Sequence, residues 1–80
     1  MATPGALAHC ERHNINPLQL IDRHAGGDWG DLSADDVNAN VHAIQHDKRI
    51  LSAYKLNGEK LYCITEWDRK VTTLLMATEY

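Results

Sequence analysis

The segment from residue 65 to residue 73 gathers many of the side chains that could carry out chemistry. It reads Thr-Glu-Trp-Asp-Arg-Lys-Val-Thr-Thr, so acidic, basic and hydroxyl groups follow one another closely. Carboxylates can move protons while cationic and hydroxyl groups hold phosphate oxygens, a combination suited to cleavage of RNA by general acid–base catalysis. The candidate catalytic residues are Glu66, Asp68, Arg69 and Thr72. The same groups would also solvate a turn between two strands, where exposed ion pairs contribute little to stability.

The five histidines raise the question of a metal site. His9 and His13 are four residues apart, as are His42 and His46, so each pair would lie on one side of a helix. Zinc peptidases use this spacing with a glutamate directly after the first histidine, and neither pair has one. Cys10 has no Cys-x-x-Cys partner that would complete a tetrahedral zinc site. We therefore expect no metal ion and no other cofactor.

The acidic residues between positions 28 and 36 and the second cysteine have simpler explanations than a site. Asp28, Asp31, Asp35 and Asp36 do not follow the alternating ligand pattern of a calcium loop. Turns favour aspartate, and the dipole favours it in the first turn of a helix. A nucleophilic Cys63 would need a histidine within reach, and no sequence feature places one there. We expect Cys63 to be a small core residue.

Three helices are expected within residues 3–48. Thr-Pro at 3–4 and Asn-Pro at 16–17 each combine a capping side chain with a proline suited to the first helical position. Gly-Gly at 26–27 ends the second helix, and Ser33 begins a longer amphipathic helix. An apolar stripe on the longer helix is expected to face the sheet and consists of Ala34, Val37, Val41 and Ile44.

A three-stranded antiparallel meander is expected over residues 49–77. Asn-Gly at 57–58 predicts a two-residue hairpin turn, because both central positions of a type I′ turn require positive φ. A second turn at 67–70 leads to a strand at 71–76 that is rich in β-branched residues. The first turn pairs Leu56 with Glu59, Lys55 with Lys60, Tyr54 with Leu61, Ala53 with Tyr62, Ser52 with Cys63, Leu51 with Ile64, and Ile50 with Thr65. The sequence thus predicts a single α+β domain spanning residues 1–80.

The predicted strands are apolar on both faces, whereas a sheet covered on one side alternates apolar and polar residues. Three short helices can cover one face, so apolar surface should remain exposed on the second unless the first two helices wrap it. The strand at 71–76 is also expected to be an unprotected edge that can pair with another chain. One face carries Ile50, Tyr54, Leu56 and Leu61, and the other carries Leu51, Ala53, Tyr62 and Ile64.

The composition limits the classes of partner. Eight Lys and Arg against eleven Asp and Glu give a net charge of −3, which argues against a nucleic-acid binder that works by bulk attraction. A local basic edge formed by Lys48, Arg49, Lys55 and Lys60 keeps a nucleic-acid-binding accessory role open. No apolar run approaches the roughly 20 residues that cross a bilayer, and the first residues lack the apolar core of a signal peptide. We expect a cytoplasmic protein.

Three strings of residues resemble a family of short bacterial proteins that are frequent on plasmids and other mobile elements. They are Gly-Asp-Trp-Gly-Asp-Leu at 27–32, Leu-Ser-Ala-Tyr at 51–54 and Ile-Thr-Glu-x-Asp-Arg-x-x-Thr-Thr at 64–73. Some members carry the label of a type I restriction enzyme subunit, although a restriction methyltransferase needs a far larger cofactor fold. The chain departs from the family at Trp67, where a small residue is usual, and at 76–78, where a proline is usual. The resemblance implies a bacterial, cytoplasmic accessory protein and supplies no site residues.

Besides the nucleic-acid-binding accessory role, two functions follow as hypotheses. The first is a non-enzymatic interaction or accessory module of a mobile element, which binds a protein partner or a second copy through a sheet face or edge strand. Its candidate binding residues are Tyr54, Leu61, Tyr62, Trp67 and Arg69. The alternative is a small nuclease-like domain, because helices followed by such a sheet are also the general layout of small ribonuclease toxins.

Overall fold

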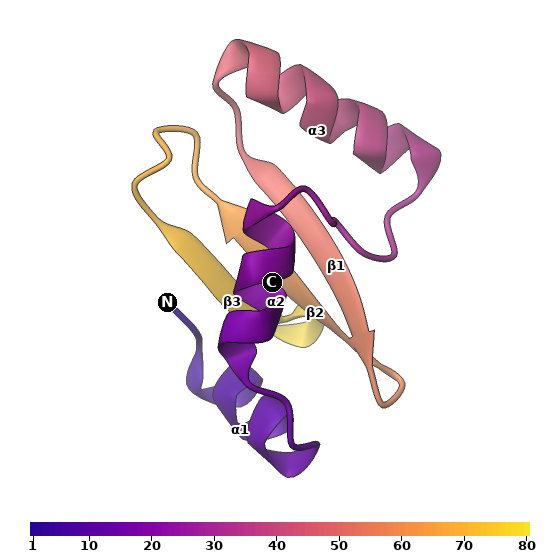
Figure 1. The fold of residues 1–80 in the computed structure, drawn as a ribbon, viewed down its shortest axis with the longest axis vertical. Coiled ribbons are helices and arrows are strands. Elements are labelled where there is room, and N and C mark those ends of the chain that lie inside the picture. The colour runs from indigo at the N-terminus through magenta and orange to yellow at the C-terminus, as the bar shows by residue number, and fades with distance from the viewer.

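The computed structural model describes all of residues 1–80 and confirms the predicted α+β fold, with three helices followed by a three-stranded antiparallel sheet (Figure 1). The last strand begins one residue later than the sequence predicts. No helix is long and apolar enough to span a membrane. The elements are α1 (Pro4–Arg12), α2 (Pro17–Ala25), α3 (Ala34–His46), β1 (Ile50–Leu56), β2 (Glu59–Thr65), β3 (Thr72–Met76) and the 3-10 helix η1 (Ala77–Glu79).

The predicted helix starts are confirmed by the hydrogen bonds of their caps. The side chains of Thr3, Asn16 and Ser33 each accept a bond from a backbone N–H in the first turn of α1, α2 and α3. These bonds satisfy amide groups that have no partner inside the helix. At its other end, α3 stops at Asp47, whose backbone takes the left-handed conformation with φ 52°.

The predicted register of the hairpin is confirmed at every pair from Leu56–Glu59 to Ile50–Thr65. Asn57 and Gly58 have φ of 52° and 83°, as a type I′ turn requires. The strand order is β1-β2-β3, so β2 is central and both of its neighbours are edges of the sheet.

The helices α1 and α2 cover one face of the sheet, and the core lies between them and the strands (Figure 1). This is the face of Tyr54 and Leu61, so the alternative in which the first two helices wrap the opposite face is wrong. The buried core consists of Ala6, Cys10, Leu20, Tyr54, Leu61, Cys63, Leu74 and Met76.

The opposite face of the sheet is apolar, as the register predicts, but it is not bare. Ala53 and Ile64 are buried on it, and Leu51 and Tyr62 are half-buried. Tyr80 places its ring edge-on against Tyr62, with ring centroids 5.5 Å apart. The largest exposed apolar side chains therefore lie on other elements than this face.

The expected orientation of α3 is wrong. The helix lies beside β1 rather than on a face of the sheet, and it buries Asn40 and Ala43 (Figure 1). Val37, Val41 and Ile44, which were expected to face the sheet, are 37%, 46% and 53% exposed.

The side chain of Asn40 explains this orientation. Its Nδ2 donates to the carbonyl of Leu51 at 2.6 Å, and its Oδ1 accepts from the N–H of Leu51 at 3.0 Å. The amide thus occupies the place that a neighbouring strand would take. Backbone groups left unpaired in a buried position cost free energy. Pairing the backbone groups at the edge of β1 therefore contributes more to stability than burial of the valines would.

The rest of the β1 edge is closed by the loop before α3. The N–H of Ala53 donates to the carbonyl of Trp29 at 3.1 Å, and the N–H of Asp31 donates to the carbonyl of Ala53 at 2.7 Å. Gly30 lies between these two bonds as a parallel bridge to Ala53.

The edge formed by β3 is also closed, so the expectation of an unprotected strand at 71–76 is wrong. Residues 1–3 run parallel to it: the N–H of Leu74 donates to the carbonyl of Met1 at 2.8 Å, and the N–H of Thr3 donates to the carbonyl of Leu74 at 3.0 Å. The N–H of Met76 donates to a carboxylate oxygen of Glu79 at 2.7 Å. Sequence periodicity contains no information about such non-local partners.

Replacing Gly30 with alanine tests the closure of the β1 edge. Gly30 has φ +71°, and a Cβ there would meet the Ala53 carbonyl and lie 2.7 Å from the Tyr54 ring. We expect Gly30→Ala to lower the free energy of unfolding by about 2–4 kcal/mol through strain and overlap. Gly27→Ala is the matched control, because Gly27 has φ +86° with nothing within 4 Å of its Cβ position. Its expected cost is about 1 kcal/mol, and equal costs in urea denaturation would contradict the close approach.

Aspartate substitutions on two sides of α3 test its orientation. Ala43 is 3% exposed and Val41 is 46% exposed. We expect Ala43→Asp to cost about 3 kcal/mol, because it buries an unpaired charge, and Val41→Asp to cost less than about 1 kcal/mol. Thermal denaturation of the two variants measures this difference. The reverse order would mean that the valines face the sheet after all.

Candidate functional site

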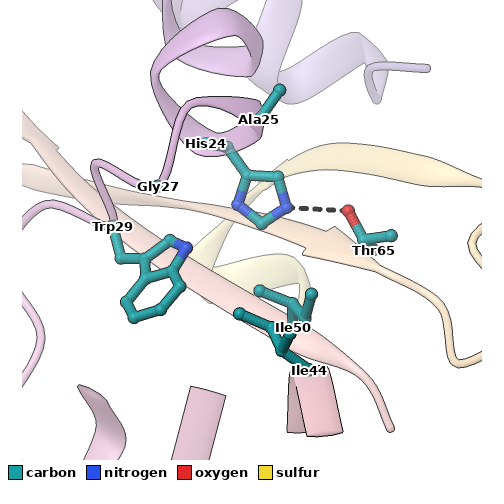
Figure 2. A pocket seen from close by; sticks show the side chains of 7 residues that line it. All are labelled: His24, Ala25, Gly27, Trp29, Ile44, Ile50 and Thr65. Carbon is teal, nitrogen blue, oxygen red and sulfur yellow. Dashed lines mark hydrogen bonds between the residues drawn. The ribbon is translucent and has the colours of Figure 1, made fainter. Parts of the chain in front are cut away.

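A hollow of about 160 Å³ lies where the C-terminal end of α2, the helix α3 and the start of β1 meet (Figure 2). Ile44 comes from α3, Trp29 from the loop that closes the β1 edge, and Ile50 and Thr65 from paired positions of the sheet. Its lining is largely apolar, with one imidazole and one hydroxyl group. The full lining is His24, Ala25, Gly27, Trp29, Ile44, Ile50 and Thr65.

His24 anchors the end of α2 to the sheet and forms one wall of the hollow. Its Nδ1 is hydrogen-bonded to Ser52 Oγ at 2.5 Å, and its Nε2 is hydrogen-bonded to Thr65 Oγ1 at 2.7 Å (Figure 2 shows the second bond). The Thr65 hydroxyl is also bonded to that of Thr72 at 2.8 Å. The ring is buried, and this burial lowers the pKa of His24. A neutral imidazole paired with two hydroxyls is therefore the stable form.

The contact between Thr65 and His24 has the distance of a nucleophile and its base, but the rest of the arrangement does not suit catalysis. An activated nucleophile needs a base that a third group orients and stabilises when it is charged, as a carboxylate does. Here the third group is the hydroxyl of Ser52, which is neutral and fully buried. No cationic side chain lines the hollow. This arrangement positions α2 and shapes the hollow.

An exposed apolar stripe leads away from the hollow along α3. We define the α3 stripe as Val37, Val41 and Ile44, of which Ile44 also lines the hollow. Exposed apolar side chains that occur singly are ordinary, but a row of three beside a recess is typical of a contact surface. The α3 stripe and the hollow together are the candidate site.

Polar contacts hold the loop beside the hollow. The Tyr54 hydroxyl donates to the carbonyl of Asp28 at 2.5 Å, and the Arg23 guanidinium lies 4.6 Å from the centre of the Tyr54 ring. Arg23 also pairs with the Asp28 carboxylate at 2.7 Å, and this bond lowers the pKa of Asp28. Trp29 is half-buried on the same loop. The wall of the hollow that contains Trp29 is therefore fixed in place.

The four candidate catalytic residues do not converge on an open site. Glu66 pairs with Arg49 at 3.0 Å, and Asp68 accepts a bond from the backbone N–H of Lys70 at 3.1 Å. Thr72 is bonded to Thr65. Each of these groups has a partner within the fold.

Arg69, the fourth of them, joins α3 to the β2–β3 turn. Its guanidinium donates to the carbonyls of Ala43 at 3.0 Å and Lys48 at 2.5 Å, and also to the carbonyls of Glu66 and Trp67. It therefore satisfies carbonyls at the C-terminal end of α3. A guanidinium committed to four carbonyls is not free to hold a phosphate.

The five candidate binding residues are divided between the core and the surface. Tyr54 and Leu61 are buried beneath α1 and α2, so neither offers a surface for a partner. Tyr62 is half-buried beside Tyr80, and Trp67 is 64% exposed on the β2–β3 turn. The structure brings none of these five residues to the hollow.

The histidine pairs on α1 and α3 lie side by side as their spacing predicts. The ring centroids of His9 and His13 are 4.6 Å apart, and those of His42 and His46 are 4.2 Å apart. His9 is buried, and its Nε2 donates to the carbonyl of Leu56 at 2.8 Å. No group of three or more potential metal ligands forms.

The cysteines and the lysine pair show no reactive arrangement. Cys10 and Cys63 are both free and buried, and burial raises the pKa of Cys63 to about 11. The Cys63 thiol therefore stays protonated near neutral pH, and the residue belongs to the core as predicted. Lys55 and Lys60 are opposite each other and exposed.

Comparisons with protein-family models, with curated proteins and with solved structures give no match to this chain.

Sequence reasoning missed the part played by His24. A signal was present in the predicted register. Ser52 and Thr65 place hydroxyl groups on the face that carries the core, at the end of the sheet nearest α2. Buried hydroxyls need polar partners, so a polar side chain from a covering helix was required there. His24 is that side chain.

The pH dependence of stability tests the burial of His24. An unfolded histidine has a pKa near 6.5, and burial lowers the pKa of His24 in the folded protein. The unfolded chain therefore binds this proton more readily, so the contribution of His24 to stability is complete above about pH 6.5 and is lost as the pH falls below that value. We expect the Tm to decrease between pH 7.5 and pH 5.5.

The control for this measurement is His24→Gln, which removes the titrating group and leaves every other histidine in place. This variant should be less stable at pH 7.5 but should show a smaller decrease in Tm on acidification. Identical decreases in both proteins would show that His24 does not titrate differently in the folded and unfolded states.

Proposed function

We propose that this chain is a small non-enzymatic interaction module that binds a protein through the α3 stripe and the adjoining hollow. The observation that supports the proposal is the exposure of Val37, Val41 and Ile44 in one row beside a recess. Protein interfaces are built around apolar side chains that enter pockets and are surrounded by polar groups. A hollow of about 160 Å³ has the size of a site for one apolar side chain of a partner.

The way in which α3 is held also supports this proposal. Two polar anchors hold it, from Asn40 to Leu51 and from Arg69 to the carbonyl of Ala43, and the small side chain of Ala43 is buried between them. These anchors fix the helix without burying its apolar side. A partner that covers the stripe would remove exposed apolar surface from water, which contributes roughly 25 cal/mol per Å² before the costs of association.

Association by strand pairing has less support than association through the helix. The edges of both β1 and β3 already have partners from within the chain. The proposed nuclease activity has no supporting observation, since Arg69 and Glu66 are engaged in the fold. The setting that we propose is the one implied by the resemblance, an accessory protein of a bacterial mobile element acting in the cytoplasm.

Affinity capture with matched variants tests the proposal. The tagged chain should retain a specific protein from bacterial extract, and Val41→Asp should reduce its recovery at least about tenfold, as loss of a central interface contact does. Val71→Asp is the control, because Val71 is 40% exposed on the β2–β3 turn and Val41 is 46% exposed on α3. Equal recovery with both variants would contradict the use of α3. Binding of the captured protein should then be titrated with purified components.

A further inference from the structure

We infer that the folded protein holds His9 as a cation between two acceptors, so that this ring links α1 to the β1–β2 hairpin in a proton-dependent way. His9 lies on α1 and is 3% exposed. One ring nitrogen faces Leu56 at the end of β1, and the other faces Glu59 at the start of β2. We define these two contacts as the His9 clasp. It shares no residue with the hollow or the α3 stripe.

The contact with Leu56 determines where the first proton lies. The Nε2 atom of His9 is 2.8 Å from the carbonyl oxygen of Leu56. A carbonyl oxygen can only accept a hydrogen bond, so Nε2 must carry a hydrogen whenever this bond is present. A neutral His9 therefore has its lone pair on Nδ1.

The lone pair of a neutral ring would lie in an unfavourable place. The Nδ1 atom of His9 is shielded from water and forms no hydrogen bond within the fold. The Oε2 atom of Glu59 lies 3.2 Å from it, and a carboxylate is also an acceptor. A neutral ring thus sets two acceptors against each other, whereas a second proton on Nδ1 converts the same contact into an ion pair. Because a buried polar atom without a partner costs free energy, the arrangement favours the cation.

The cationic side chains nearby are directed to solvent or to the other face of the sheet. Lys55 and Lys60 are opposite each other in the register, one pair along from the residues that His9 contacts. Since successive residues of a strand point to opposite faces, both lysine side chains lie on the face away from α1. Arg12 is one turn further along α1 and is exposed, so water weakens its repulsion of a cation at His9.

The other titratable group beside this ring is His13. Its ring centroid is 4.6 Å from that of His9. The side-chain amide of Asn57 donates to the Nε2 atom of His13 at 3.4 Å, so that nitrogen carries a lone pair and the His13 ring is neutral. Two adjacent cations would repel each other, and a neutral His13 removes this obstacle to a charged His9.

The His9 clasp makes the attachment of α1 to the hairpin depend on pH. An unfolded histidine has a pKa near 6.5. Because folding favours the charged form of His9, the contribution of the clasp to stability is complete below about pH 6.5 and is lost as the pH rises above that value. This direction is opposite to the one expected for His24.

The ¹⁵N chemical shifts of the histidine rings test the charge of His9 directly. At about pH 7, where an exposed histidine is mostly neutral, we expect the two ring nitrogens of His9 to have similar shifts, as in a cation. In Glu59→Gln the carboxamide can donate to Nδ1, so the two shifts should separate as in a neutral ring. Glu11→Gln is the matched control, because Glu11 is exposed on α1 and lies two residues from His9, on another side of the helix. It should leave the cation in place.

Widely separated shifts for His9 in the wild type would overturn the inference, and so would similar shifts in Glu59→Gln. The variant His9→Gln assigns the signals, since it lacks only those of His9.

Urea denaturation across a range of pH tests the effect of the clasp on stability. The midpoint of the wild type should exceed that of Glu59→Gln at about pH 6, and this advantage should shrink towards zero by about pH 9. The difference between the wild type and Glu11→Gln should not change in this way. His24 is present in all three proteins, so its titration cancels in each difference. An advantage over Glu59→Gln that is the same at both pH values would overturn the proton-dependent clasp.

Discussion

The structure depends on one requirement, which is that the outer backbone groups of β1 must have partners. In a three-stranded sheet two strands are edges, and the edge of β1 borders the chain's longest helix. Asn40 and the loop around Gly30 supply the partners for Leu51 and Ala53. Because an amide side chain can donate and accept at once, a single asparagine replaces a pair of backbone groups. The position of α3 follows because the side chain of Asn40 pairs with Leu51 in place of a neighbouring strand.

The orientation of α3 in turn determines which surface the protein offers. With Asn40 turned towards β1, the valines of the helix are exposed to solvent and Ile44 lies at the hollow. Polar side chains of the sheet also determine this surface, because the hydroxyls of Ser52 and Thr65 hold His24 at the wall of the hollow. Polar contacts thus fix the framework of the site, and the apolar groups left over form its surface. In this respect α3 differs from a helix that packs its apolar side against the core.

Much of the fold could be predicted from the sequence, and the limits have physical causes. The caps at Thr3, Asn16 and Ser33 and the Asn57-Gly58 turn are local signals, so the helix starts and the whole hairpin register follow from a few residues. Periodicity ranks residues by their preference for burial, and it ranked the valines of α3 above Asn40. Periodicity does not take into account that the backbone groups of a strand elsewhere in the sequence also need hydrogen-bond partners.

The candidate site was less predictable than the fold because its parts come from distant positions. His24, Ile44 and Thr65 lie on three separate elements. The acidic and basic residues near Arg69 were predicted to be catalytic. A guanidinium can equally bind carbonyls at the end of a helix, and the guanidinium of Arg69 does so at the end of α3.

The pairing of residues 1–3 with β3 has a consequence for how the molecule is made. The bond between the amino group of Met1 and the carbonyl of Thr72 joins residues 71 positions apart, and the bonds to Leu74 span a similar distance. Contacts so remote along the chain are slow to form, since a long loop must close before they contribute. During synthesis, residues 1–3 therefore emerge from the ribosome well before β3, the strand that they border. The edge of β3 is closed only after the two segments have come together, and until then its outer backbone groups lack these partners.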